Sequence, residues 1–136
     1  MKPLRVLIVD DNDLNVQLAA FVLAEGGMTV ESAAGATQAL AHIETFRPDL
    51  ILMDIQMPEM DGLELTRRLK ADPLTRRIVV VAFTAFAMKG DEAKMRAAGC
   101  DGYVAKPIDI ATFAGTIRAF VATDDADGAS GFGAMA

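Results

Sequence analysis

Five short runs of apolar residues alternate along the chain with longer segments in which apolar positions recur every three to four residues. The short runs are nearly continuous and rich in β-branched residues, which is typical of strands buried on both faces of a parallel sheet. The second run alternates polar and apolar positions, so we expect it toward an edge of the sheet. The predicted strands span residues 4–9, 28–33, 50–54, 78–83 and 102–105.

The longer segments carry signals for the beginning and the end of helices. Asn12 and Asp13 offer N-cap side chains to the first helix, and Gly26 and Gly27 end it. The apolar positions of this helix are Leu14, Leu18, Phe21 and Val22. The predicted helices span residues 14–25, 35–46, 63–71, 91–98 and 110–121. The alternation predicts a doubly wound parallel α/β sheet, in which right-handed crossovers bring the carboxyl ends of all strands to one edge.

The chain length of 136 residues suits one domain, which we place at residues 1–123. Residues 124–136 lack any period and are rich in Gly and Ala, so we expect a disordered tail there. An apolar fraction of 52% is what a sheet covered by helices on both faces requires.

Charge and composition exclude several partners. A formal net charge of -6 disfavours nucleic acid, because that affinity rests on Lys and Arg side chains that neutralise phosphates. No apolar run has the length of a membrane-spanning helix, and the N-terminus does not resemble a secretory signal. Cys100 is the single cysteine, so we expect neither a disulfide within the chain nor a cysteine metal site, and we predict a small buried side chain. These features favour a cytoplasmic protein.

Acidic side chains follow two of the predicted strands, and a hydroxyl and an ammonium group follow two others. Three clustered carboxylates repel one another unless a cation lies among them, which implies a hard divalent ion such as Mg²⁺ or Mn²⁺. The side chains at this edge are those of Asp10, Asp11, Asp54, Thr84 and Lys106. We expect Asp11 and Asp54 to bind the ion directly, Asp10 to act through water, and the backbone carbonyl of Gln56 to fill a further position.

This set of groups is suited to phosphoryl transfer. Asp54 ends the central strand and is the candidate nucleophile, which would become an aspartyl phosphate. Lys106 would pair with one phosphoryl oxygen, and the Thr84 hydroxyl with the backbone N–H of Ala85 would bind another.

The ordered motifs VDD, LMDIQMPEMDG, FTA and AKP resemble the receiver domain of two-component response regulators over residues 4 to about 122. The passage TAFAMKGDEAKMRAAGCDGYVAKPID further resembles the small single-domain cell-cycle receivers of the DivK type. The resemblance implies a flavodoxin-like, doubly wound five-stranded parallel sheet with strand order 2-1-3-4-5 and five helices.

The resemblance also implies roles for single residues. Asp54 would take phosphate from a phosphohistidine, with Asp10 and Asp11 serving Mg²⁺ and with Thr84 and Lys106 contacting the phosphate. The Lys106-Pro107 peptide bond would be cis. Tyr103 occupies the position of the switch aromatic, which would rotate inward once phosphorylation draws Thr84 toward the phosphate.

The leading hypothesis is a stand-alone receiver that takes its phosphoryl group from a histidine kinase or a histidine phosphotransfer protein. It would catalyse only its own phosphorylation and dephosphorylation, and would signal through contact with a downstream protein. The phosphodonor is expected to bind the first helix and the loop after the fifth strand. The residues predicted for this contact are Asn15, Leu18, Pro107 and Ile108.

Three alternatives compete with this hypothesis. A Mg²⁺-dependent phosphohydrolase would carry a second acid two residues after its nucleophile, where this chain has Gln56. A dinucleotide-binding domain lacks support because no G-x-G-x-x-G follows the first strand. The sequence does not exclude the third alternative, that the chain is the receiver fragment of a larger hybrid kinase.

Overall fold

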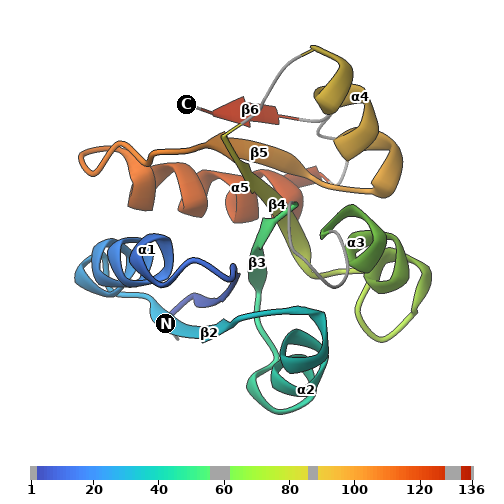
Figure 1. Ribbon diagram of the computed structural model, residues 1–136, viewed down its shortest axis with the longest axis horizontal. Coiled ribbons are helices and arrows are strands. Elements are labelled where there is room, and N and C mark those ends of the chain that lie inside the picture. The colour runs from blue at the N-terminus through green and yellow to red at the C-terminus, as the bar shows by residue number, and fades with distance from the viewer. Residues whose placement is uncertain (1–2, 56–61, 86–88, 128–132, 136) are drawn as a thin grey trace.

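A parallel sheet lies between two layers of helices in the computed structural model, which describes residues 3–55, 62–85, 89–127 and 133–135 (Figure 1). The strands are β1 (Arg5–Val9), β2 (Thr29–Ala33), β3 (Leu50–Asp54), β4 (Val79–Thr84), β5 (Gly102–Ala105) and β6 (Gly133–Met135). The helices are α1 (Asp13–Glu25), α2 (Ala36–Phe46), α3 (Gly62–Ala71), α4 (Lys89–Ala98) and α5 (Phe113–Asp127). No helix within these ranges is long and apolar enough to span a membrane.

The sheet has the order β2-β1-β3-β4-β5-β6, and every neighbouring pair is parallel. The predicted order 2-1-3-4-5 is therefore confirmed, as is the edge position of β2. All residues of β3 and β4 are buried, which agrees with their continuous apolar sequences.

The end of the chain differs from the expected disordered tail in its described parts. Helix α5 runs on to Asp127, and β6 adds to the free edge of β5. The helix continues because Gly128 is the first glycine or proline after Gly115. Strand β6 pairs with the open edge of the sheet at β5. The composition of the tail alone does not predict such a contact with a distant segment.

Alternating strand positions build two cores, one on each face of the sheet. Leu7 and Ile51 face the layer of α2, α3 and α4, whereas Ile8 and Leu52 face the layer of α1 and α5. Cys100 lies buried in the first core, as predicted.

Helix α1 presents most of its predicted apolar stripe to solvent. Leu14 is 77% exposed and Phe21 is 65% exposed, and Leu18 is also exposed. The face that packs against the sheet consists of Ala19, Val22 and Leu23. This helix carries apolar residues on several of its sides. Their spacing therefore predicted a helix but could not show which side is buried against the sheet.

Helix α5 begins at Phe113, three residues after the predicted start at residue 110. The Asp109 carboxylate accepts the backbone N–H of Ala111 at 3.0 Å, and the Asp109 carbonyl accepts that of Phe113 at 2.9 Å. These hydrogen bonds form a turn over residues 109–113, because an aspartate side chain readily accepts the backbone N–H two residues further on. The helix therefore begins after this turn.

Candidate functional site

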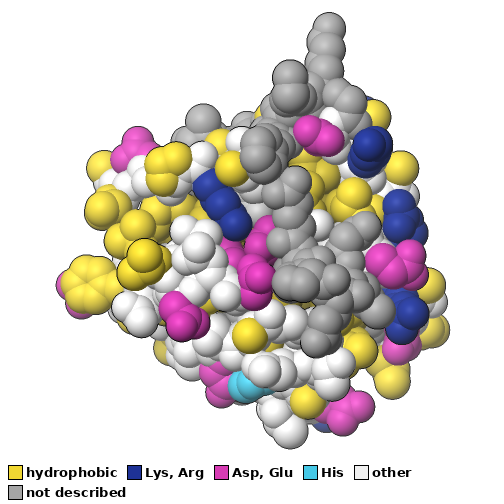
Figure 2. Space-filling view, in the orientation of Figure 1, with side chains coloured by type: hydrophobic (Ala, Val, Ile, Leu, Met, Phe, Trp, Pro, Cys, Tyr) yellow, Lys and Arg dark blue, Asp and Glu magenta, His cyan; other side chains and the backbone are white. Residues whose placement is uncertain are grey.

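The registers of the central strands bring the predicted site residues to one edge of the sheet. Val9 lies opposite Met53, so the next residues, Asp10 and Asp54, end neighbouring strands. Thr84 lies opposite Ala105, the residue before Lys106. In Figure 2 acidic side chains gather near the centre of this face, with a basic side chain beside them.

Three carboxylates form a tight cluster at this edge. One oxygen from each of Asp10, Asp11 and Asp54 lies within 4.8 Å of the other two. Asp10 is 2% exposed and Asp54 is 4% exposed, whereas Asp11 faces solvent. The Asp10 carboxylate accepts the backbone N–H of Asn12 at 2.8 Å and the Asn15 side-chain amide at 3.5 Å. The loop after β1 therefore holds Asp10 in place while leaving Asp11 accessible.

Lys106 lies between two of these carboxylates. Its Nζ is 3.2 Å from Asp10 Oδ2 and 3.6 Å from Asp54 Oδ2, and its side chain is 17% exposed. The same Nζ lies 4.9 Å from the centroid of the Phe83 ring, which stacks on Phe113 at 6.3 Å. Phe83 thus supports the ammonium group by a cation–π contact.

The backbone joins Thr84 to Lys106. Thr84 is 2% exposed at the end of β4, and its carbonyl accepts the Lys106 N–H at 2.8 Å. The Lys106-Pro107 peptide bond is cis, as the family resemblance implied. These contacts place the hydroxyl-bearing residue and the ammonium-bearing residue on adjoining strand ends.

Tyr103 lies apart from the carboxylate cluster. Its ring is partly buried against the core under α2, α3 and α4, and its hydroxyl donates to Glu92 Oε1 of α4 at 2.5 Å. This hydrogen bond is the main cause that raises the Tyr103 pKa, because the acceptor carboxylate favours the protonated phenol. Tyr103 therefore stays neutral at physiological pH and connects β5 to α4.

Two residues of the site were not predicted from the sequence. The sequence pattern predicted for Phe83 only a place in a strand. Its position directly before Thr84 was the one signal in the sequence that it lies close to the site. Gly62 begins α3 against the end of β3: an added Cβ would overlap the Asp54 carbonyl oxygen and lie 2.8 Å from Met53 Cγ. Only glycine permits this approach. Gln56, the predicted carbonyl ligand, lies outside the described residues.

The donor set fits a hard divalent cation. Within the described residues, three carboxylates and the Lys106 ammonium give this partly buried cluster a formal charge of -2, which favours a cationic counter-ion. The clustered ligand atoms are all carboxylate oxygens, without the nitrogen or sulfur ligands typical of zinc. Mg²⁺ and Mn²⁺ prefer such oxygens.

The predicted partner surface lies beside this pocket. Leu18 and Pro107 are exposed, whereas Ile108 packs partly against the core under α1 and α5. Asn15 is half-buried next to Asp10. Figure 2 shows hydrophobic side chains gathered over α1, next to the acidic recess.

Residues 6–118 match the family described as response regulator receiver domain, and the chain belongs to this family. Receiver domains of two-component systems accept a phosphoryl group on an aspartate. Among curated relatives, the chain is 45% identical over 119 residues to the polar-differentiation response regulator DivK of Brucella anthropi, covering 88% of this chain and 97% of the relative. The DivK protein of Brucella ovis is 47% identical over 117 residues, which cover 85% of this chain and 94% of the relative.

Solved structures agree with this assignment. The chemotaxis protein CheY4 of Vibrio cholerae superimposes with a TM-score of 0.82 at 27% identity, covering 87% of this chain and 98% of that one. A CheY-like receiver domain protein of Methanospirillum hungatei gives 0.81 at 29% identity, covering 90% and 97%. The flavodoxin-like CheY fold is thus confirmed.

Proposed function

We propose that Asp54 is the phosphoacceptor of this receiver and that it takes the phosphoryl group from a histidine kinase or a histidine phosphotransfer protein. The observation that carries this proposal is the position of Asp54, a buried carboxylate within 4.8 Å of two further acids and 3.6 Å from the Lys106 ammonium. Each neighbour has a separate use in phosphoryl transfer.

Asp54 would attack the phosphorus atom, forming a carboxyl O–P bond while the P–N bond of the phosphohistidine breaks and the imidazole leaves with its electron pair. Lys106 would pair with a phosphoryl oxygen, and the Thr84 hydroxyl would donate to another. A Mg²⁺ or Mn²⁺ ion held by Asp10, Asp11 and Asp54 would neutralise charge on the transferred group.

We further assign the switch to Thr84 and Tyr103, on the basis of the family resemblance and the place of Tyr103 between β5 and α4. An inward shift of Thr84 would open space for the Tyr103 ring. Such a rotation breaks the hydrogen bond to Glu92 and changes the surface of α4 and β5. That surface would contact the downstream protein.

The phosphodonor would bind α1 and the loop after β5. The exposed apolar side chains of Leu14, Leu18 and Phe21 offer α1 as a surface for a partner helix, and Asn15 joins this surface to the acidic pocket. Pro107 and Ile108 extend it from the β5–α5 loop. The proposed setting is the cytoplasm, where histidine kinases present their phosphohistidine.

A phosphohydrolase acting on external substrates is not favoured. The chain belongs to the receiver family, and the residue two positions after Asp54 is Gln56, which cannot serve as a general acid or base. The proposed chemistry is confined to the phosphorylation and dephosphorylation of Asp54 itself.

Labelling by acetyl phosphate in the presence of Mg²⁺ tests this function. We expect one phosphoryl group per chain, none in Asp54→Asn, and undiminished labelling in the control Asp72→Asn, which changes an exposed aspartate remote from the cluster. Labelling of Asp54→Asn equal to that of the unchanged protein would contradict the proposal.

A further inference from the structure

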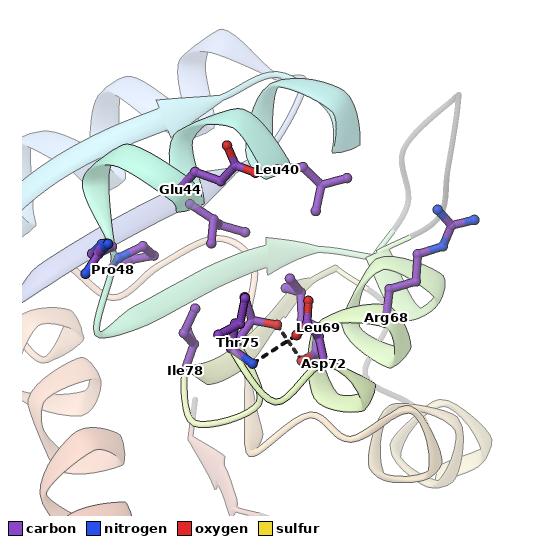
Figure 3. A pocket seen from close by; sticks show the side chains of 11 residues that line it. Leu40, Glu44, Pro48, Arg68, Leu69, Asp72, Thr75 and Ile78 are labelled. Carbon is purple, nitrogen blue, oxygen red and sulfur yellow. Dashed lines mark hydrogen bonds between the residues drawn. The ribbon is translucent and has the colours of Figure 1, made fainter.

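The molecule has a second recess, between α2 and the C-terminal part of α3, far from the carboxylate cluster. Its volume is about 800 Å³, and Figure 3 shows that side chains from both helices and from the loop after α3 face into it. It flanks the beginning of β3, whereas Asp54 ends that strand, and a five-residue strand spans about 16 Å. A molecule bound here would leave the phosphorylation site open.

The floor of this recess is apolar and its edge carries exposed leucines. Ile43 and Leu69 are 6% and 2% exposed at the floor. Leu40 is 40% exposed at the rim, and Leu74 is 90% exposed, the highest value among the large hydrophobic residues that the structure describes. An exposed apolar rim over an apolar floor is typical of a surface that binds another molecule.

The loop that carries Leu74 is held in place by hydrogen bonds. The Thr75 hydroxyl donates to the Leu69 carbonyl at 2.7 Å, and the Leu74 N–H donates to the Asp72 carboxylate at 2.9 Å. Lys70 Nζ donates to the Ile78 carbonyl at 2.7 Å. Leu74 is thus presented by a fixed turn, which lowers the entropy cost of binding.

The charges around the recess select the partner. Residues 67–77 contain five basic residues and one acid, although the whole chain has a net charge of -6. Three of the basic residues form ion pairs with acids outside this range: Arg67 and Arg68 with Glu64, and Lys70 with Asp101. The single acid, Asp72, is already engaged in the turn. Arg47, Arg76 and Arg77 are exposed and make no ion pair within the described ranges. The acidic residues that line the recess are Glu44 of α2 and Asp72.

We infer that the recess between α2 and α3 binds an acidic amphipathic segment of a partner protein. Apolar side chains of the segment would pack over Ile43 and Leu69 against Leu40 and Leu74. Its carboxylates would face Arg47, which lines the recess, and the exposed Arg76 and Arg77, which lie in the chain between the lining residues Thr75 and Ile78. The contact is independent of the phosphodonor surface on α1, so both partners can bind one receiver at the same time.

Titration of the ¹⁵N-labelled protein with a synthetic acidic peptide tests this inference. The peptide carries two leucines at positions i and i+4 among glutamates, and a matched peptide carries lysines in place of the glutamates. We expect saturable shifts of amides in residues 40–49 and 69–78. We also expect affinity about tenfold weaker in Leu74→Asp and in the double variant Arg76→Glu with Arg77→Glu.

The control variant Leu14→Asp, which changes an exposed leucine on α1, should keep the peptide affinity of the unchanged protein. Labelling of Asp54 by acetyl phosphate should also stay unchanged in Leu74→Asp, which separates this inference from the phosphoacceptor proposal. Equal binding of the lysine peptide, shifts confined to α1 or the acidic pocket, or no saturation up to about 1 mM peptide would each overturn the inference.

Discussion

Replacement of Lys106 by Met makes the charge balance of the pocket measurable. The methionine keeps an unbranched apolar chain, one atom shorter than that of lysine, beside the Phe83 ring. It removes the ammonium that lies 3.2 Å from Asp10 and 3.6 Å from Asp54. The substitution thus removes the Lys106 charge from beside two carboxylates that are almost fully buried.

The expected loss in the free energy of unfolding without divalent ions is about 3 kcal/mol, the lower end of what breaking a buried ion pair costs. The lower end applies because Lys106 keeps 17% of its side-chain exposure and water screens part of the interaction. Saturating Mg²⁺ should restore much of the loss, because the ion then supplies the missing positive charge. The variant should also bind Mg²⁺ more tightly, while its labelling by acetyl phosphate slows.

Urea denaturation with EDTA and with Mg²⁺ measures both effects, and Lys94→Met serves as a control on the exposed face of α4. If Lys106→Met were as stable as the unchanged protein in EDTA, or if Mg²⁺ stabilised both proteins equally, the ammonium would not compensate this cluster and the reasoning would be wrong.

The remaining predictions concern three other positions. Gly62→Ala should lose about 2 kcal/mol of stability in urea denaturation and label more slowly, because its Cβ displaces the Asp54 carbonyl; unchanged labelling would argue against this tight approach. Asp11→Asn should raise the melting temperature in EDTA by relieving repulsion and weaken Mg²⁺ binding in calorimetry; a lower melting temperature would contradict the repulsion. Burial raises the Cys100 pKa to about 11, so below that pH the folded thiol should resist iodoacetamide and react only on unfolding; rapid alkylation of the native protein at pH 8 would contradict its burial.

Much of the fold followed from the sequence because its signals are local. Continuous apolar runs predicted β3 and β5 at their observed bounds, and glycine and proline marked the helix ends. Once the strands were expected to be parallel, their common direction placed Asp10, Asp54 and Lys106 at one edge of the sheet. The structure brings these three side chains together as predicted.

The features that sequence reasoning missed depend on contacts between distant segments. The support of Lys106 by Phe83 requires β4 and the loop after β5 to be placed in space. The need for glycine at position 62 arises from the carbonyl of Asp54, which belongs to another element. The exposed face of α1 depends on which side of an apolar helix meets the sheet. None of these leaves a periodic signal in the local sequence.

The chemical identity of the phosphorylated side chain is the most direct test. Borohydride reduces an aspartyl phosphate to homoserine, so treatment with acetyl phosphate and Mg²⁺, followed by reduction and peptide mass spectrometry, reports the modified position. The structure predicts conversion of Asp54 alone, dependent on Mg²⁺ and reduced in Lys106→Met. Conversion of Asp10 or Asp11 instead, or no conversion of Asp54 in the presence of Mg²⁺, would contradict the account.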